Sequence, residues 1–186
     1  MVQFAVGVAA GETDRPMPGT VSKHLEKLVQ SLNVLIVEDN PHMRKVIRNL
    51  LTTIGIKRVS EAADGIEGLE VIRTAAPDVV LLDWEMPLLN GTELVRIVRS
   101  PGVFPTPDLP IIVVSAHGER WRVVEAMRLG VNEYLIKPLS AQALHDRLVT
   151  IMANPRPIVQ REGYYGPEPR RLLPGMAAGP EDASAA

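Results

Sequence analysis

Five short strand-like runs, each followed by a stretch of helical periodicity, organise most of this 186-residue chain. A run that is apolar throughout is typical of a strand buried on both faces, and the spacing after it is that of an amphipathic helix. Strands and helices that alternate in this way form a parallel sheet with helices on both sides. The sequence therefore predicts an α/β fold with a doubly wound five-stranded parallel sheet, whose strands are expected at Val34–Val37, Lys57–Ala63, Asp78–Asp83, Ile111–Ser115 and Glu133–Lys137.

Helix start and stop signals agree with this alternation. After the first strand, Asn40 is a good N-cap, Pro41 suits the first helical turn, and Gly55 is a typical helix end. The four later helices are expected to start at Asp64, Asn90, about Glu119 and Ser140, with the fourth ending at Gly130 and the last at about Met152.

The flanks of the βα region differ from it in composition. Residues 1–31 form an N-terminal extension in which a short amphipathic helix is expected over residues 20–30, and Met17 is an alternative start to Met1. The first residues lack a basic region and their apolar run is too short to span a bilayer, so neither a signal peptide nor an anchor is expected. Residues 32–153 form the main domain, and the proline-, glycine- and alanine-rich residues 154–186 are expected to form a largely extended or disordered tail.

Charge and cysteine content restrict the functional class. The formal net charge is −2, which argues against a protein that binds nucleic acid through net positive charge. The chain has no cysteine, so disulfides and thiolate metal sites are excluded, and a reducing, cytoplasmic location is expected.

Polar side chains stand where the predicted strands end. Glu38 and Asp39 follow the first strand, Asp83 ends the third, Ser115 the fourth and Lys137 the fifth. Each residue alone has an ordinary explanation as a surface charge or a turn residue. Because the carboxyl ends of parallel strands meet at one edge of the sheet, the five side chains are expected to converge. Three carboxylates without histidine or cysteine favour a hard cation, and Mg²⁺ is the expected cofactor.

A carboxylate beside bound magnesium can act as a nucleophile toward phosphorus and form an aspartyl phosphate. Asp83 is the best candidate for this role, because it stands alone on the predicted central strand and is followed by the turn "WEMP". Lys137 and the hydroxyl group of Ser115 would then contact the oxygens of the phosphoryl group.

The segments "VLIVEDN", "LLDWEMPLLNG", "VVSAHG" and "YLIKPLS" resemble the response-regulator receiver domain, particularly the single-domain CheY type, over Leu32 to about Met152. This resemblance implies a flavodoxin-like sheet of strand order 2-1-3-4-5. It also implies that Asp83 accepts a phosphoryl group from a histidine kinase or phosphotransfer protein. Asp39 would ligate magnesium directly, Glu38 would do so through water, and the backbone carbonyl of Glu85 would be a further ligand. The bond between Lys137 and Pro138 is expected to be cis.

The resemblance also implies a signalling switch rather than an enzyme, with no catalysis beyond its own phosphoryl transfer and autodephosphorylation. Ser115 would move toward the phosphoryl group and Tyr134 would turn inward. These changes would alter a face formed by the fourth helix, the fifth strand and the fifth helix, and a downstream protein would bind there. Trp121 lies on the polar side of the fourth helix and suggests a contact for that partner, although it could instead lie flat against its own helix.

Two residues depart from the family pattern, because Glu85 and His117 stand two positions after Asp83 and Ser115. In this family these places face the attacking water, so both residues are expected to tune dephosphorylation. A monomer or a weak phosphorylation-dependent dimer is expected, without direct contact with nucleic acid or membrane.

Three alternatives remain open at this point. The receiver could be a phosphorelay intermediate or a phosphate sink. The same acids could serve a phosphatase in which Glu85 acts as the general acid and base, although no substrate cap domain is visible. The last segment could bind nucleic acid, and the residues for this are Tyr164, Tyr165, Arg170 and Arg171.

Overall fold

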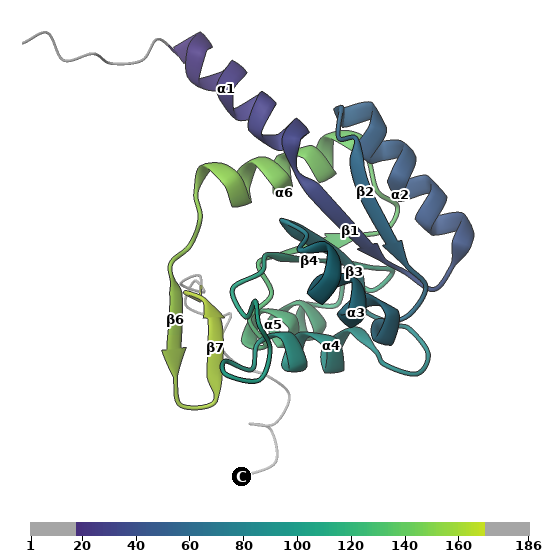
Figure 1. Cartoon of the computed structure of the whole chain (residues 1–186), viewed down its shortest axis with the longest axis vertical. Helices are drawn as coiled ribbons and strands as arrows, with labels where there is room; N and C mark the ends of the chain where they lie inside the picture. The colour runs from purple at the N-terminus through teal and green to yellow at the C-terminus, as the bar shows by residue number, and fades with distance from the viewer. Residues whose placement is uncertain (1–17, 170–186) are drawn as a thin grey trace, which may run out of the picture.

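A single parallel sheet of five strands forms the centre of the molecule (Figure 1). The computed structural model describes residues 18–169, and the side chains from residue 23 onward. The strand order is β2-β1-β3-β4-β5, which confirms the predicted order, and every neighbouring pair in this sheet is parallel. The strands are β1 (Asn33–Val37), β2 (Arg58–Ala62), β3 (Val79–Asp83), β4 (Ile111–Ser115) and β5 (Glu133–Ile136).

The helices begin at the residues that the sequence marks as caps. The side chain of Asn40 accepts hydrogen bonds from the backbone N–H groups of His42 and Met43, and Asn90 forms a capping box with Glu93. Gly55 ends its helix with φ 99°, a conformation that favours glycine. The helices are α1 (Pro18–Ser31), α2 (Pro41–Ile54), α3 (Gly65–Ala75), α4 (Gly91–Val98), α5 (Arg120–Arg128) and α6 (Ala141–Ala153).

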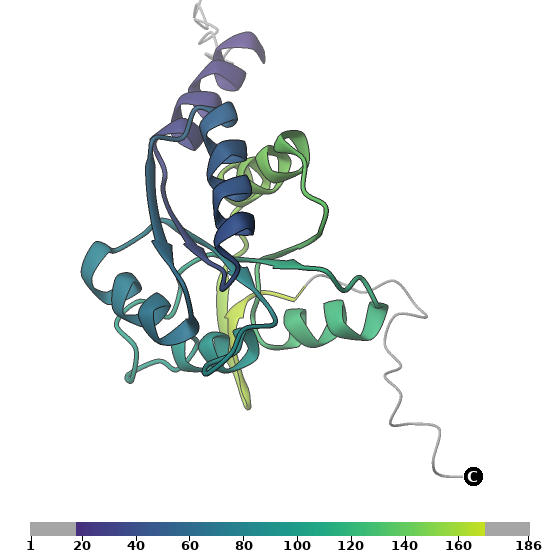
Figure 2. The same ribbon diagram turned by 90° about the vertical axis from the view of Figure 1, so that its right-hand side faces the viewer.

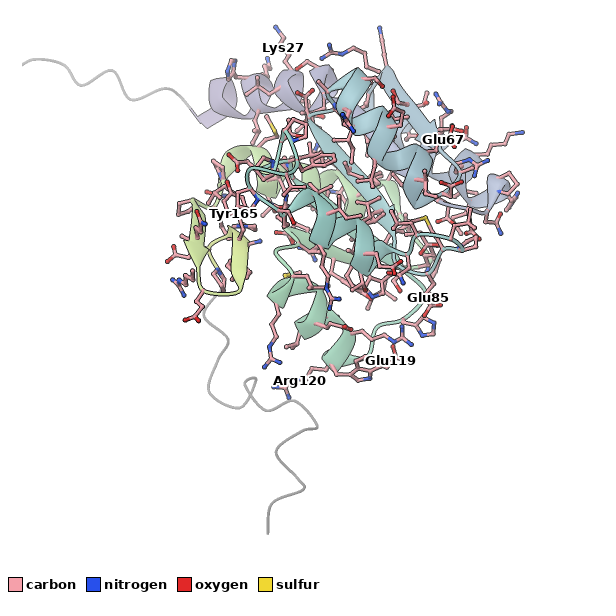
Figure 3. All side chains as sticks on the ribbon, turned by 60° about the horizontal axis from the view of Figure 1, so that its bottom comes forward. Lys27, Glu67, Glu85, Glu119, Arg120 and Tyr165 are labelled. Atoms are coloured by element: carbon pink, nitrogen blue, oxygen red, sulfur yellow. The ribbon has the colours of Figure 1, made fainter. Side chains whose placement is uncertain are left out.

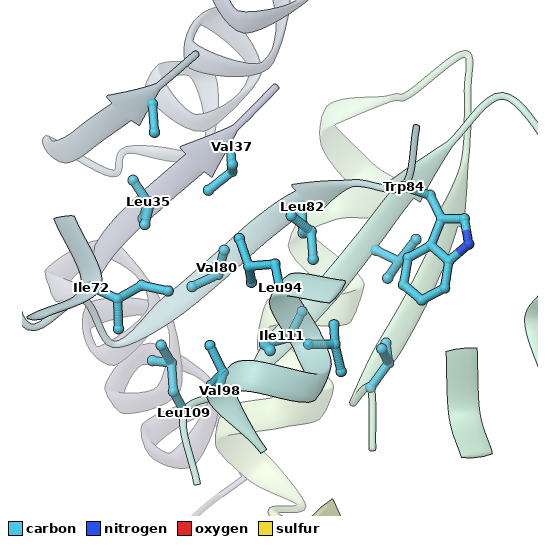
Figure 4. Close-up of a cluster of buried hydrophobic side chains, with 14 of the residues drawn as sticks. Leu35, Val37, Ile72, Val80, Leu82, Trp84, Leu94, Val98, Leu109 and Ile111 are labelled. Carbon is cyan, nitrogen blue, oxygen red and sulfur yellow. The ribbon is translucent and has the colours of Figure 1, made fainter. Parts of the chain in front are cut away.

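Two apolar layers cover the two faces of the sheet. On one face, side chains of α3, α4 and α5 pack against alternate strand residues such as Leu35, Val80 and Leu82 (Figure 4). On the other face, α1, α2 and α6 pack against Val34, Ile36 and their neighbours (Figure 2). All five residues of β3 and all five of β4 are buried, because helices cover these strands on both sides.

An additional helix, α1, precedes the first strand and lies along α6 (Figure 1). Val29 is fully buried in the contact, and the carboxylate of Glu26 lies 3.3 Å from Nε2 of His145 on α6. Its observed range agrees with the helix that the sequence predicts over residues 20–30. The extension therefore covers part of the α6 surface.

The segment after α6 differs from the extended or disordered tail that the sequence predicts for residues 154–186. Residues 158–167 form an antiparallel hairpin of β6 (Ile158–Arg161) and β7 (Tyr164–Pro167), and residues 170–186 lie outside the described range. The hairpin packs against the domain. Arg156 donates a hydrogen bond to the backbone oxygen of Asn132, and the hydroxyl group of Tyr165 donates one to Asp108. Tertiary contacts therefore fix a segment whose composition favours disorder.

Candidate functional site

Three carboxylates meet at the carboxyl edge of the sheet. Strand β1 ends at Val37, so Glu38 and Asp39 emerge beside the end of β3, where Asp83 lies. Carboxylate oxygens of the three residues lie within 4.8 Å of one another. Glu38 and Asp83 are buried and Asp39 is exposed. The helix that starts after Asn40 turns the chain here, and the guanidinium group of Arg44 donates to the backbone oxygens of both Glu38 and Asp39.

Lys137 supplies the positive charge of this cluster. Its Nζ lies 2.8 Å from Oε2 of Glu38 and 3.2 Å from Oδ2 of Asp83. Burial raises the pKa of Glu38, and the hydrogen bond from Lys137 opposes that effect. Burial alone would lower the pKa of Lys137, but the hydrogen bond to Glu38 and the charge of Asp83 raise it above its usual value. Lys137 is therefore a cation held between two carboxylates, and its bond to Pro138 is cis, as the resemblance implies.

The position of Asp83 is fixed by the chain that follows it. The backbone N–H of Gly91 donates to the oxygen of Trp84 at 3.1 Å, and the Trp84 ring is buried in the core. A Cβ atom on Gly91 would lie 2.8 Å from the backbone oxygen of Asp83 and 2.9 Å from Cα of Trp84. The start of α4 therefore touches the strand end directly, and only glycine permits this approach.

Ser115 and Tyr134, the two expected switch residues, are joined through one residue. The backbone N–H of His117 donates to Oγ of Ser115 at 3.1 Å, and the hydroxyl group of Tyr134 donates to the backbone oxygen of His117 at 2.6 Å. Ser115 is buried and Tyr134 is half-buried, and this burial raises the pKa of Tyr134. The backbone of His117 therefore contacts both switch residues.

A network of charged side chains surrounds the mouth of the site (Figure 3). Oε2 of Glu85 lies 3.1 Å from Nε2 of His117, and Oε1 of Glu85 accepts a hydrogen bond from Arg122 at 2.8 Å. Glu119 lies 3.4 Å from the other ring nitrogen of His117 and 3.7 Å from Arg122. Sequence reasoning identified Glu85 and His117 but missed Arg122, although its place three residues after Glu119 fits a helical ion pair.

The polar side of α5 carries an exposed aromatic ring. Trp121 is 51% exposed, and the guanidinium carbon of Arg122 lies 4.8 Å from the centre of its ring. Ile136 on the neighbouring strand β5 is 50% exposed. The structure therefore presents two large apolar side chains to solvent on the α5 and β5 surface, which corresponds to the fourth helix and fifth strand of the sequence prediction.

The donor set fits a magnesium ion. Magnesium prefers oxygen ligands and accepts one or two carboxylates. The three acids offer oxygens at close range, and one of them, Asp39, is open to solvent. Glu38 and Asp83 already need a cation for stability, because each is buried and they lie near one another.

Comparisons with known proteins agree with this geometry. The family model of the response regulator receiver domain matches residues 34–149. Chemotaxis protein CheY1 of Helicobacter pylori is 37% identical over 122 residues, which cover 65% of this chain and 97% of that protein. The solved structure of CheY4 from Vibrio cholerae has a TM-score of 0.57 at 29% identity, over 63% of this chain and 96% of that one.

A receiver domain from a sensor histidine kinase of Pseudomonas aeruginosa is also similar, with a TM-score of 0.57 and 30% identity over 63% of this chain and 94% of that one. That domain was crystallised with a magnesium ion coordinated in its active-site cleft. Within residues 18–169 of the present chain, no helix has the length and apolar character needed to cross a bilayer.

Proposed function

The chain belongs to the response-regulator receiver family of two-component signalling, with a CheY-like domain, and from this premise we propose that Asp83 is its phosphoacceptor. The donor is the phosphohistidine of a histidine kinase or phosphotransfer protein. A carboxylate oxygen of Asp83 forms a bond to phosphorus as the N–P bond of the donor breaks, and the electron pair of that bond stays on the imidazole nitrogen. The protein then acts as a switch for binding a partner protein.

The observation that carries this proposal is the contact of Lys137 with both Glu38 and Asp83 at the edge where β1 and β3 end. The ammonium group lies 3.2 Å from the nucleophilic carboxylate, so it is placed to neutralise a phosphoryl oxygen on Asp83. The hydroxyl group of Ser115 ends the adjacent strand β4 and can donate to a second oxygen.

Glu38, Asp39 and the backbone carbonyl of Glu85 are the proposed ligands of a magnesium ion beside Asp83. When bound, the ion neutralises the negative charge that accumulates between the acids and the phosphoryl group. Glu38 and Arg44 hold the loop that presents Asp39, since Arg44 donates to both backbone oxygens. The chain itself therefore places the ligands and the nucleophile before any donor arrives.

The readout proposed for the switch passes through His117. Movement of Ser115 toward a phosphoryl group removes the acceptor of the His117 backbone N–H, and the same residue accepts the hydrogen bond from Tyr134. Tyr134 is thereby released to turn inward, which changes the surface formed by α5, β5 and α6. Trp121 and Ile136, both half exposed on this surface, are the candidate contacts for a partner.

Glu85 and His117 are proposed to set the lifetime of the phosphoryl group. Their side chains meet at 3.1 Å beside the phosphoacceptor, and Arg122 holds the second oxygen of Glu85. A side-chain pair across this opening limits the approach of water to Asp83.

The phosphatase alternative is less well supported. A general acid at Glu85 needs a carboxyl group that exchanges protons with substrate, whereas both of its oxygens pair with basic side chains. For the nucleic-acid alternative, Tyr164 and Tyr165 use their hydroxyl groups within the protein, and Arg170 and Arg171 lie outside the described residues.

Acetyl phosphate with magnesium tests the proposal on the full chain. The wild type is expected to gain one phosphoryl group in intact-mass spectra, and Asp83→Asn is expected to gain none. Asp146→Asn is a matched control, because Asp146 is exposed on α6, away from the site, and should be labelled like the wild type. Equal labelling of Asp83→Asn would refute the assignment of the phosphoacceptor. Rapid turnover of varied phosphoesters without stable labelling would favour the phosphatase.

Partner binding separates a switch from the other receiver functions. Wild type treated with beryllofluoride and magnesium is expected to retain a partner that Asp83→Asn does not retain. A partner held equally by both would contradict switching for that partner. Transfer of the phosphoryl group from Asp83 to a histidine of another protein would identify a phosphorelay intermediate or a phosphate sink instead.

A further inference from the structure

A cavity of about 630 Å³ lies between the β6–β7 hairpin and the C-terminal ends of α4 and α5. Four arginines line it, and among the described lining residues none is aspartate or glutamate. These are Arg96 and Arg99 at the end of α4, Arg128 at the end of α5, and Arg161 on the hairpin. The cavity therefore collects positive charge in a protein whose formal net charge is −2.

Arg99 has a structural role in this group. It is buried, and its guanidinium group donates to the backbone oxygens of Gly130 and Pro107 and to the side-chain oxygen of Asn132. Burial lowers the pKa of Arg99 to about 10, so it remains a cation at neutral pH. Its hydrogen bonds hold the loops before β4 and β5 together and form the floor of the cavity.

The other three arginines are exposed and have their donors available. The side chains of Arg96 and Arg128 make no hydrogen bond or ion pair with any residue in the described range 18–169. Arg161 has one acidic neighbour, Glu168, at 3.9 Å. An arginine in the last turn of a helix favourably meets the helix dipole, which explains Arg96 and Arg128 separately. It does not explain Arg161, which the hairpin brings to the same cavity.

Two tyrosine rings complete the lining. The hydroxyl group of Tyr164 donates to the backbone oxygen of Pro167 and that of Tyr165 donates to Asp108, so the polar ends of both rings are already engaged. Their aromatic rings line the cavity from the hairpin side (Figure 3). Cavities of roughly 300–1,000 Å³ are typical of small-molecule sites.

Guanidinium groups bind phosphates bidentately, and nucleobases stack on aromatic faces. From this combination we propose that the cavity binds a nucleotide. Its phosphates contact Arg96, Arg128 and Arg161, and its base lies against the rings of Tyr164 and Tyr165.

The proposed site is separate from the phosphorylation site. The hairpin meets the domain at Asp108 and Asn132, which precede β4 and β5, whereas Asp83 lies at the opposite ends of the strands. The two sites are therefore tested independently, and the nucleotide would act on a phosphorylated or an unphosphorylated protein.

Fluorescence polarisation of labelled ATP and labelled GTP with the full chain tests this proposal. At least one label is expected to bind saturably and to be displaced by the matching unlabelled nucleotide, and at least tenfold more weakly by pyrophosphate. Arg128→Gln and Arg161→Gln are each expected to weaken binding about tenfold, the loss of one charge-assisted contact. Arg73→Gln is the matched control, because Arg73 also lies exposed in the last turn of a helix, α3, away from the cavity.

Several outcomes would overturn the proposal. These are no saturable binding of either nucleotide, equal affinity in Arg128→Gln, Arg161→Gln and Arg73→Gln, or displacement by pyrophosphate as strong as by nucleotide. Displacement by an acidic peptide at equal concentration would assign the cavity to a protein partner instead. Asp83→Asn is expected to bind like the wild type, and loss of binding in that variant would place the nucleotide at the phosphorylation site and overturn the inference.

Discussion

Replacement of Lys137 by alanine tests how the acidic cluster is stabilised. In the structure, Lys137 contacts Glu38 and Asp83, whose side chains are only 2% and 9% exposed. Removing one partner of a buried ion pair usually costs 3–5 kcal/mol, because a charge is left without compensation. Lys137 itself is 15% exposed, so we expect the lower end, a loss of about 3 kcal/mol in the free energy of unfolding without metal.

Magnesium should reduce this loss. An ion that binds only the folded protein stabilises it by about 2.7 kcal/mol at 100 times its Kd. In Lys137→Ala the carboxylates have no competing cation, so the ion should bind more tightly than in the wild type. The ion replaces the charge of Lys137 but not the packing of its aliphatic stem, which is worth about 1–2 kcal/mol when largely buried. The difference between variant and wild type should therefore fall from about 3 to about 1–2 kcal/mol.

Urea unfolding followed by circular dichroism, in EDTA and in a magnesium series, measures both quantities. Lys57→Ala is the control, because Lys57 is exposed outside the site and its loss should change stability by less than about 0.5 kcal/mol. A stability loss in Lys137→Ala that stays the same at every magnesium concentration would refute the reasoning, since Lys137 and the metal would then not share the carboxylates.

Two further predictions concern packing and pH. Gly91→Ala should destabilise the protein by about 1–3 kcal/mol, because its Cβ would meet the backbone of Asp83 and Trp84 at 2.8–2.9 Å. Gly118→Ala, whose Cβ would meet only the end of the flexible Ile136 side chain, should change stability by less than about 0.5 kcal/mol, and equal urea midpoints for the two variants would contradict this account. In the folded protein the pKa values of all three tyrosines lie above the usual value of 10: burial raises those of Tyr134 and Tyr164, and the hydrogen bond to Asp108 raises that of Tyr165. A raised folded-state pKa gives stability that is complete below pH 10 and is lost as the pH rises through the folded-state values, so ultraviolet titration should detect tyrosinate at higher pH in buffer than in urea.

The sheet could be predicted because its signals are local. The fully apolar runs that became β3 and β4 admit few other structures, and the caps at Asn40 and Asn90 were predicted from residue type and form in the structure. The hairpin could not be predicted in this way. Its strands have four residues each and include Gly166 and Pro167, and its position depends on contacts with Asn132 and Asp108, which precede it in the chain by more than twenty residues.

The site divides along the same line. Strand ends predicted that Glu38, Asp39, Asp83, Ser115 and Lys137 lie at one edge, because the edge follows from the topology. Side-chain partners do not follow from topology. The contact of Arg122 with Glu85 depends on where α5 begins, and the shared contact of Ser115 and Tyr134 with His117 depends on the path of a loop. These details required three-dimensional coordinates.

The approach of the hairpin to Gly130 has a consequence for the evolution of the chain. Gly130 has φ 91°, which asparagine can also adopt, but a Cβ atom there would lie 2.7 Å from the backbone oxygen of Tyr165. A Cβ atom on Gly166 would in turn lie 2.8 Å from Cα of Gly130. Relatives that carry the hairpin should therefore keep glycine at both positions together, whereas relatives without it should accept asparagine at the position of Gly130.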